Sequence, residues 1–359
     1  MLVRYPAAAF AENWLHDGLI AILNRALDGV IDPMEHWTAS FPDEHRDAVG
    51  RKTSLKAGLQ RVVETIATMD QAGRDALRTC IIEQNRLPEA FSAAVRPPAV
   101  GGDPADLANH LDDLFNCAFK MLTPLGVRDR HYRLVYDGVR GRVCGFCGIE
   151  RLSAPVEGTP REDLDHYLAL SLYPLAGANL RNLAPIGGRC NSSYKRDQDI
   201  LRDANGVPRR CLDPYGTQQV EVSLLGSQPL RGGRKGTAIL PKWEITLEGA
   251  DADRIATWNE VFEIEHRYRN DVLDADFVDW IDHFATWGAA QCTPANADDL
   301  VRLIRCYIAT VVQEGIADAA FLKRATFKML AYRIEHCDDA DRVAAWLLSL
   351  WSVEAGVVA

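Results

Sequence analysis

The chain has 359 residues, a length that suits two or three domains rather than one. Its 47% hydrophobic and 25% charged residues are ordinary for a soluble globular protein. No stretch reaches the roughly 18 uninterrupted apolar residues that a membrane span requires, and Pro6, Glu12 and His16 come too early for a secretory signal. We therefore expect a cytoplasmic protein with no membrane partner.

The net charge of −10 argues against nucleic-acid binding, because contact with phosphate needs Lys and Arg. The charge is unevenly distributed, however. Residues 126–242 hold 18 Lys+Arg against 12 Asp+Glu, and the remainder holds 22 against 38. A basic centre between acidic flanks favours a central segment that faces nucleic acid, although a neutral domain can show a balance of this size by chance.

The first 125 residues predict a helical N-terminal domain. Apolar residues recur there at intervals of three and four in three runs, which is the pattern of helices that bury one face. Ordinary core packing explains these stripes. The runs are Leu15, Leu19, Ile22, Leu23, Ala26 and Leu27; Leu55, Leu59, Val62, Val63 and Ile66; and Leu107, Leu111, Leu114, Phe115 and Ala118.

The pattern of apolar residues changes twice after this domain. Residues 126–215 consist of short apolar pieces separated by Gly, Pro, Asn and Cys, without a sustained helical period. Residues 216–250 predict a β-hairpin, because apolar residues alternate on both sides of the turn "SQPLRGGRKG". From residue 251 to 359 the helical period returns. We therefore expect an α+β fold, mostly helical, with a central site module. The alternating residues of the hairpin are Val220, Val222 and Leu224, then Trp243, Ile245 and Leu247.

The nine cysteines are an odd number, scattered along the chain, which argues against a secreted disulfide framework. Only Cys144 and Cys147, in "CGFC", have the spacing of metal ligands. They precede a segment that places Asp165-His166, Asn182 and Cys190-Asn191 close together in the sequence.

These residues suit the hydrolysis of a phosphodiester, which needs a base for the attacking water and a cation to offset charge. Carboxylate and amide oxygens such as those of Asp165 and Asn191 are the ligands that Mg²⁺ prefers. His166 has the neutral-range pKa of a general base. The amide of Asn182 can bond backbone across the long loop after Tyr167 and so orient that base.

The same pieces resemble the HNH, or ββα-metal, endonucleases, which are built on a treble-clef zinc scaffold. Residues 140 to 200 carry the resemblance, in the order "CGFC", "DHY", "NLAP", "CN" and a following lysine. It implies that a ββα module hydrolyses DNA with Mg²⁺ or Mn²⁺, with His166 and Asn182 as catalytic residues. It further implies that Asp165 and Asn191 bind that metal, the latter at the start of a helix "NSSYKRDQDILRD", and that Lys195 and Arg189 bind substrate.

The sequence departs from this family at Gly187, where the second zinc knuckle normally has its first cysteine. Tetrahedral Zn²⁺ takes four ligands, and Cys144, Cys147 and Cys190 supply three. Cys211 is one candidate for the fourth, a residue brought in by the fold is another, and an empty site is the third alternative.

The resemblance also suggests a setting in bacterial anti-phage defence or mobile-element biology, with DNA and an ATPase or sensor protein as partners. Two alternatives stay open. The module can be a catalytically degenerate scaffold that binds nucleic acid or a partner, and the substrate can be RNA. The basic residues expected to contact phosphate are Arg128, Arg130, Arg133, Arg140 and Arg142 before the site, and Arg231, Arg234 and Lys235 in the hairpin.

Overall fold

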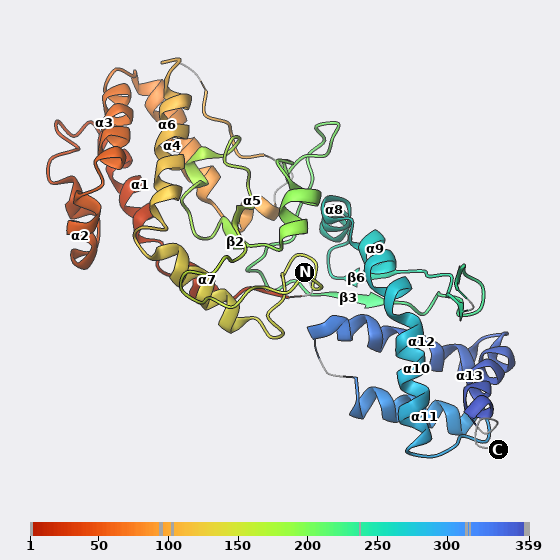
Figure 1. Ribbon diagram of the computed structural model, residues 1–359. Helices are drawn as coiled ribbons and strands as arrows, with labels where there is room; N and C mark the ends of the chain where they lie inside the picture. Colours follow the sequence, from red (N-terminus) through yellow and green to blue (C-terminus); the bar gives the residue numbers. More distant parts are fainter. Residues whose placement is uncertain are drawn as a thin grey trace.

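The computed structural model describes residues 3–92, 96–101, 104–236, 238–312, 315 and 317–354 of the chain. It is an α+β structure in which helices predominate and the described strands form two-stranded sheets (Figure 1). The N-terminal helices lie at one end, the irregular central segment lies in the middle, and the last helices lie at the other end. None of the helices in the described ranges is long and apolar enough to cross a membrane.

The N-terminal helices confirm the three predicted stripes. Leu19, Leu59 and Leu111, one from each stripe, are fully buried in one shared core. Short 3₁₀ turns η1 (Ala7–Phe10) and η2 (Trp37–Ser40) accompany the helices. The helices are α1 (Trp14–Leu27), α2 (Asp43–Gly50), α3 (Thr53–Ala67), α4 (Gln71–Asn85), α5 (Glu89–Ser92) and α6 (Leu107–Met121).

Helix α7 (Val127–Gly138) contradicts the expectation that residues 126–215 lack a sustained helix. Its buried face consists of Val127, His131, Tyr132 and Val135. Two of these four side chains are polar or amphipathic, so the apolar period that marks other helices is missing from the sequence.

The expected hairpin is present, with a shorter second strand. Strand β3 (Val220–Ser223) pairs in antiparallel register with β6 (Thr246–Gly249), and β4 (Arg234–Lys235) pairs with β5 (Ala238–Ile239). Trp243 and Ile245 precede β6 rather than lying in it. Both are buried, and the indole N–H of Trp243 donates to the Asp274 carboxylate of the C-terminal part at 2.8 Å.

The C-terminal part is helical, as predicted. Its buried residues share one hydrophobic core with the cysteine-rich part of the central segment, whereas Leu164 and Leu183 of that segment belong to the N-terminal core. The central segment therefore connects two cores. The C-terminal elements are α8 (Ala252–Phe262), α9 (Ile264–Arg267), η5 (Tyr268–Leu273), α10 (Asp274–Ala289), α11 (Ala297–Thr310), η6 (Ala317–Ala319), α12 (Ala320–His336) and α13 (Ala340–Glu354).

His131 of α7 is buried where η1 meets the central segment, and its Nδ1 lies 2.8 Å from the carbonyl oxygen of Ala9. Burial lowers its pKa to about 4, against an ordinary value of 6.5. The unfolded chain therefore binds this proton first as the pH falls. Above about pH 6.5 the ring is neutral in both states and this group does not lower the free energy of unfolding. As the pH falls from there to about pH 4, the unfolded chain gains the proton and the folded chain does not, so the free energy of unfolding falls.

We expect the free energy of unfolding to fall by on the order of 2 kcal/mol from this group alone between about pH 7 and about pH 5. Urea denaturation of the parent chain and of a His131→Gln chain at both pH values measures it. The variant should lose less stability on acidification, and an equal loss in both chains would contradict the assignment.

Candidate active site and metal centre

The Asp-His and Asn-Leu-Ala-Pro motifs form a two-stranded antiparallel sheet. Strand β1 (Leu164–His166) pairs with β2 (Leu183–Pro185), so that Asp165 lies opposite Ala184 and His166 opposite Leu183. The loop between the strands contains the short turn η3 (Pro174–Ala176). Because side chains alternate along a strand, Asp165 and His166 leave the sheet on different faces.

Asn182 closes the loop between these strands. Its side chain is fully buried, and its Oδ1 accepts a hydrogen bond from the Leu168 N–H at 2.7 Å. Its Nδ2 donates to the carbonyls of Leu168 and Ala176 at 3.0 and 3.3 Å. The amide thus fixes the backbone that follows His166.

His166 is held in one orientation. Its Nε2 lies 2.8 Å from the Gly177 carbonyl oxygen, which can only accept, so Nε2 carries the hydrogen and Nδ1 keeps a free lone pair. The ring packs on Phe119, with centroids 4.3 Å apart. Burial lowers the pKa of His166 to about 4, the nearby charge of Lys195 acts in the same direction, and the Gly177 carbonyl opposes both. The imidazole is therefore neutral near pH 7.

Asp165 is paired with Lys195. The Lys195 Nζ lies 2.9 Å from the carboxylate and also donates to the His166 carbonyl at 2.8 Å. Burial raises the pKa of Asp165, and the lysine partly offsets that rise. Lys195 is only 1% exposed, which differs from its expected role in substrate binding, because its charge is already engaged within the protein.

The helix expected from Asn191 onward is cut short. Element η4 (Cys190–Lys195) is a π-helix of six residues, and Arg196 then adopts a left-handed φ of 51°. Asn191 lines an open surface hollow of about 380 Å³ together with Asp163 and Ser192. Neither Asp165 nor His166 lines that hollow.

The two predicted Mg²⁺ ligands therefore lie in different surroundings. The carboxylate of Asp165 is occupied by an ammonium group, and the amide of Asn191 opens onto the hollow. In this arrangement they do not form a donor set that fits Mg²⁺.

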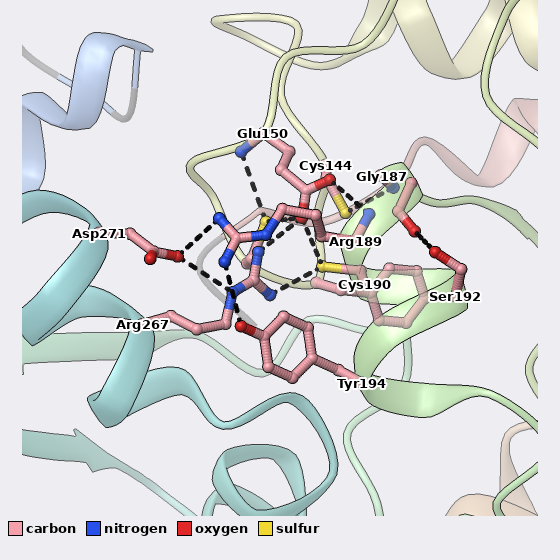
Figure 2. Close-up of polar contacts among 12 residues, drawn as sticks. Cys144, Glu150, Gly187, Arg189, Cys190, Ser192, Tyr194, Arg267 and Asp271 are labelled. Carbon is pink, nitrogen blue, oxygen red and sulfur yellow. Dashed lines mark hydrogen bonds and ion pairs between the residues drawn. The ribbon is translucent and has the colours of Figure 1, made fainter.

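Arg189 and two of the five arginines ahead of the site form ion pairs within the protein. The half-exposed Arg189 lies 2.8 Å from the Asp271 carboxylate (Figure 2). Arg128 pairs with Asp163, and Arg130 with Glu12. Any contact with phosphate would have to compete with these carboxylates.

The three predicted zinc ligands do converge. Cys144, Cys147 and Cys190 are buried, and their sulfur atoms lie within 4.8 Å of one another. The "CGFC" segment is folded as a tight knuckle, in which Gly148 has a φ of 71° and donates its N–H to the Cys144 carbonyl at 2.8 Å. A buried group of three thiols can bind a metal such as zinc.

Cys211 is not the missing fourth ligand. It is buried, but it does not belong to the group of sulfur atoms that could hold one ion. Its backbone N–H donates instead to Phe91, at 2.9 Å.

The pKa values of the three thiols are shifted in different directions. Burial alone opposes the charged form of Cys147, but the neighbouring thiols of Cys144 and Cys190 and the guanidinium of Arg267 together hold its pKa well below the ordinary value. Burial raises the pKa of Cys190 and of Cys144. One thiolate is therefore favoured in this cluster.

Two residues that sequence reasoning missed complete the surroundings of the thiols (Figure 2). The Oε1 of Glu150 lies 3.3 Å from the Cys190 sulfur, and Arg267 reaches both groups from α9. Glu150 follows Cys147 by three residues, so its proximity was open to inference from the sequence. Arg267 lies 77 residues beyond Cys190 and carried no such signal.

Comparison with known proteins gives no relative. No protein-family model matches the chain, and neither a curated protein nor a solved structure is significantly similar to it.

Proposed function

We propose that this chain is a metal-dependent endonuclease of the HNH type that hydrolyses phosphodiester bonds of DNA. The observation that supports the proposal is the β1–β2 pair. It carries a carboxylate and a neutral, oriented imidazole on successive residues of one strand, followed by a loop that Asn182 closes, and the same segment contains the cysteine cluster.

In this proposal His166 is the general base. Its Nε2–H stays on Gly177 while Nδ1 accepts the proton of the attacking water, and cleavage leaves a 5′-phosphate and a 3′-hydroxyl. A Mg²⁺ or Mn²⁺ ion held by Asp165 and Asn191 would offset the negative charge that develops on the phosphate. Lys195 must first release Asp165, so the pair described above corresponds to a resting state.

The proposed setting is bacterial anti-phage defence, in the cytoplasm, with an ATPase or sensor protein as partner. A partner that displaces Lys195 would provide a reason for such a resting state.

The Lys195–Asp165 pair also favours a second function. A carboxylate that is permanently neutralised by a buried lysine cannot bind a divalent ion, and the module would then be a scaffold that binds nucleic acid or a partner.

Cleavage of supercoiled plasmid decides between the two. We expect nicking or linearisation by the purified chain with Mg²⁺ or Mn²⁺ and none with EDTA, while a His166→Ala chain purified in the same way cuts at least about a hundredfold more slowly. Single-stranded RNA in a parallel reaction tests the alternative substrate. Intact plasmid and RNA with every metal, from a folded chain, would leave the scaffold as the better proposal.

A further inference from the structure

The cysteine cluster has a carboxylate beside two of its three sulfur atoms. Glu150 Oε1 lies 3.3 Å from the sulfur of Cys190 and 3.8 Å from that of Cys147. The backbone of Glu150 is part of the same knuckle, because its carbonyl accepts from the Cys144 N–H at 2.7 Å and its own N–H points at the Cys147 sulfur, at 3.5 Å. Its side chain therefore starts from a fixed position beside the thiols.

Gly187 explains how this carboxylate fits. A Cβ atom added at Gly187 would lie 2.5 Å from Glu150 Oε2 and 2.9 Å from its Cβ. The Gly187 backbone is not in the left-handed region, so no conformational demand requires glycine at this position. Glu150 thus occupies the volume that a side chain at position 187 would fill, and its Oε2 is fixed there by the backbone N–H of Arg189 at 3.0 Å.

Arg267 orients the carboxylate from the other side. This guanidinium is fully buried and donates to Glu150 Oε1 at 2.5 Å and to the Cys190 sulfur at 3.0 Å (Figure 2). Its plane also lies over the ring of Tyr194, 4.4 Å from the centroid. Burial of a guanidinium is costly unless it is paired with an anion, and the Glu150 carboxylate provides that partner.

The charges of such a site balance better with Arg267 than without it. Three thiolates and one carboxylate exceed the charge of a Zn²⁺ ion by two, and the guanidinium reduces the excess to one. Zinc also binds carboxylate oxygens, in addition to the nitrogen and sulfur ligands that are commonest in structural sites.

We propose that this chain binds a structural Zn²⁺ ion through Cys144, Cys147, Cys190 and Glu150, with Arg267 as the residue that positions the Glu150 carboxylate. In this ligand set Glu150, which follows the first knuckle, takes the place of the cysteine that the second knuckle normally has at the position of Gly187. It is independent of nuclease activity and applies equally to a scaffold.

The first test is the zinc content of the full-length chain, purified without added metal, by mass spectrometry. We expect close to one zinc per chain, and affinity in competition with a chromogenic chelator at least about tenfold weaker for Glu150→Ala. Glu157→Ala, at an exposed glutamate of the following loop, is the matched control and should retain full affinity. A folded parent chain without zinc would overturn the proposal and leave Arg267 as the only cation of the cluster among the described residues.

A ligand exchange keeps the proposal testable if Glu150→Ala does not fold. In the double variant Glu150→Gly, Gly187→Cys the whole side chain of Glu150 is removed, so its space accepts a cysteine side chain and the site has four sulfur ligands. With Co²⁺ in place of zinc, the thiolate-to-metal absorption should be stronger in this variant than in the parent chain. Equal absorption in the two chains, or an unchanged cobalt spectrum in Glu150→Ala, would show that Glu150 is not a ligand.

Zinc affinity and the cobalt spectrum of Arg267 variants test the role of this residue separately. Arg267→Met should weaken zinc binding by about 10- to 100-fold and shift the cobalt spectrum, because the carboxylate loses its orientation. Arg267→Lys, which keeps the charge without the two-pronged contact, should recover part of the affinity. If Arg267 only supported the fold, both variants would lose stability while the cobalt spectrum stayed that of the parent chain.

Discussion

Replacement of His166 by alanine is expected to slow metal-dependent cleavage of plasmid DNA by about 10²- to 10⁴-fold, the usual contribution of a general base. The effect follows from the hydrogen bond that fixes the ring on Gly177 and leaves Nδ1 free. Burial keeps the imidazole neutral near pH 7, so the lone pair is available without prior deprotonation.

Initial rates of nicking, measured at saturating Mg²⁺ with equal amounts of folded chain, provide the test. His336→Ala, at an exposed histidine near the end of α12, is the matched control and should leave the rate unchanged. Equal nicking by the His166→Ala chain and the parent would mean that another group takes the proton, or that a contaminant cuts the plasmid.

Replacement of Lys195 by methionine is expected to lower the free energy of unfolding by about 3–5 kcal/mol, because the buried carboxylate of Asp165 then has no cationic partner. Denaturation in urea at about pH 7 measures the change. Adding Asp165→Asn to this variant removes the unpaired charge, so the double variant should recover most of the lost stability. A double variant as unstable as Lys195→Met would show that packing of the lysine stem, rather than the charge pair, stabilises the site.

The same variant separates the two proposed functions. If Asp165 is a metal ligand once Lys195 leaves it, added Mn²⁺ should stabilise the Lys195→Met chain by an amount that grows with the logarithm of its concentration. The double variant lacks the carboxylate and should not respond. Thermal melting with and without Mn²⁺ gives the comparison, and an unresponsive Lys195→Met chain would favour the scaffold.

The helices at both ends of the chain were predictable because each buries an apolar stripe. Leu15 and Leu23 of α1, or Leu300 and Ile304 of α11, recur at helical intervals and are buried as that pattern requires. Helix α7 was not predicted because it lacks such a stripe: its buried face includes His131 and Tyr132. A polar residue can be buried when the fold supplies its hydrogen-bond partners, and periodicity alone does not reveal those partners.

Part of the site was also determined locally. The pairing of β1 with β2, the closure of their loop by Asn182 and the convergence of three cysteines involve residues close together in the sequence. Motif order and spacing were enough to bring them together. The length of η4 was not determined by motif spacing, because the element ends where the backbone of Arg196 adopts a positive φ.

The sequence by itself determined the helical ends, the hairpin and the three thiols, since these depend on periodicity and short spacing. Only the tertiary structure decided what surrounds the site. Lys195 neutralises Asp165 from η4, and Arg267 reaches Glu150 and Cys190 from a helix of the C-terminal part. Buried charges must find opposite charges wherever packing brings them, and their distance along the chain does not limit that choice.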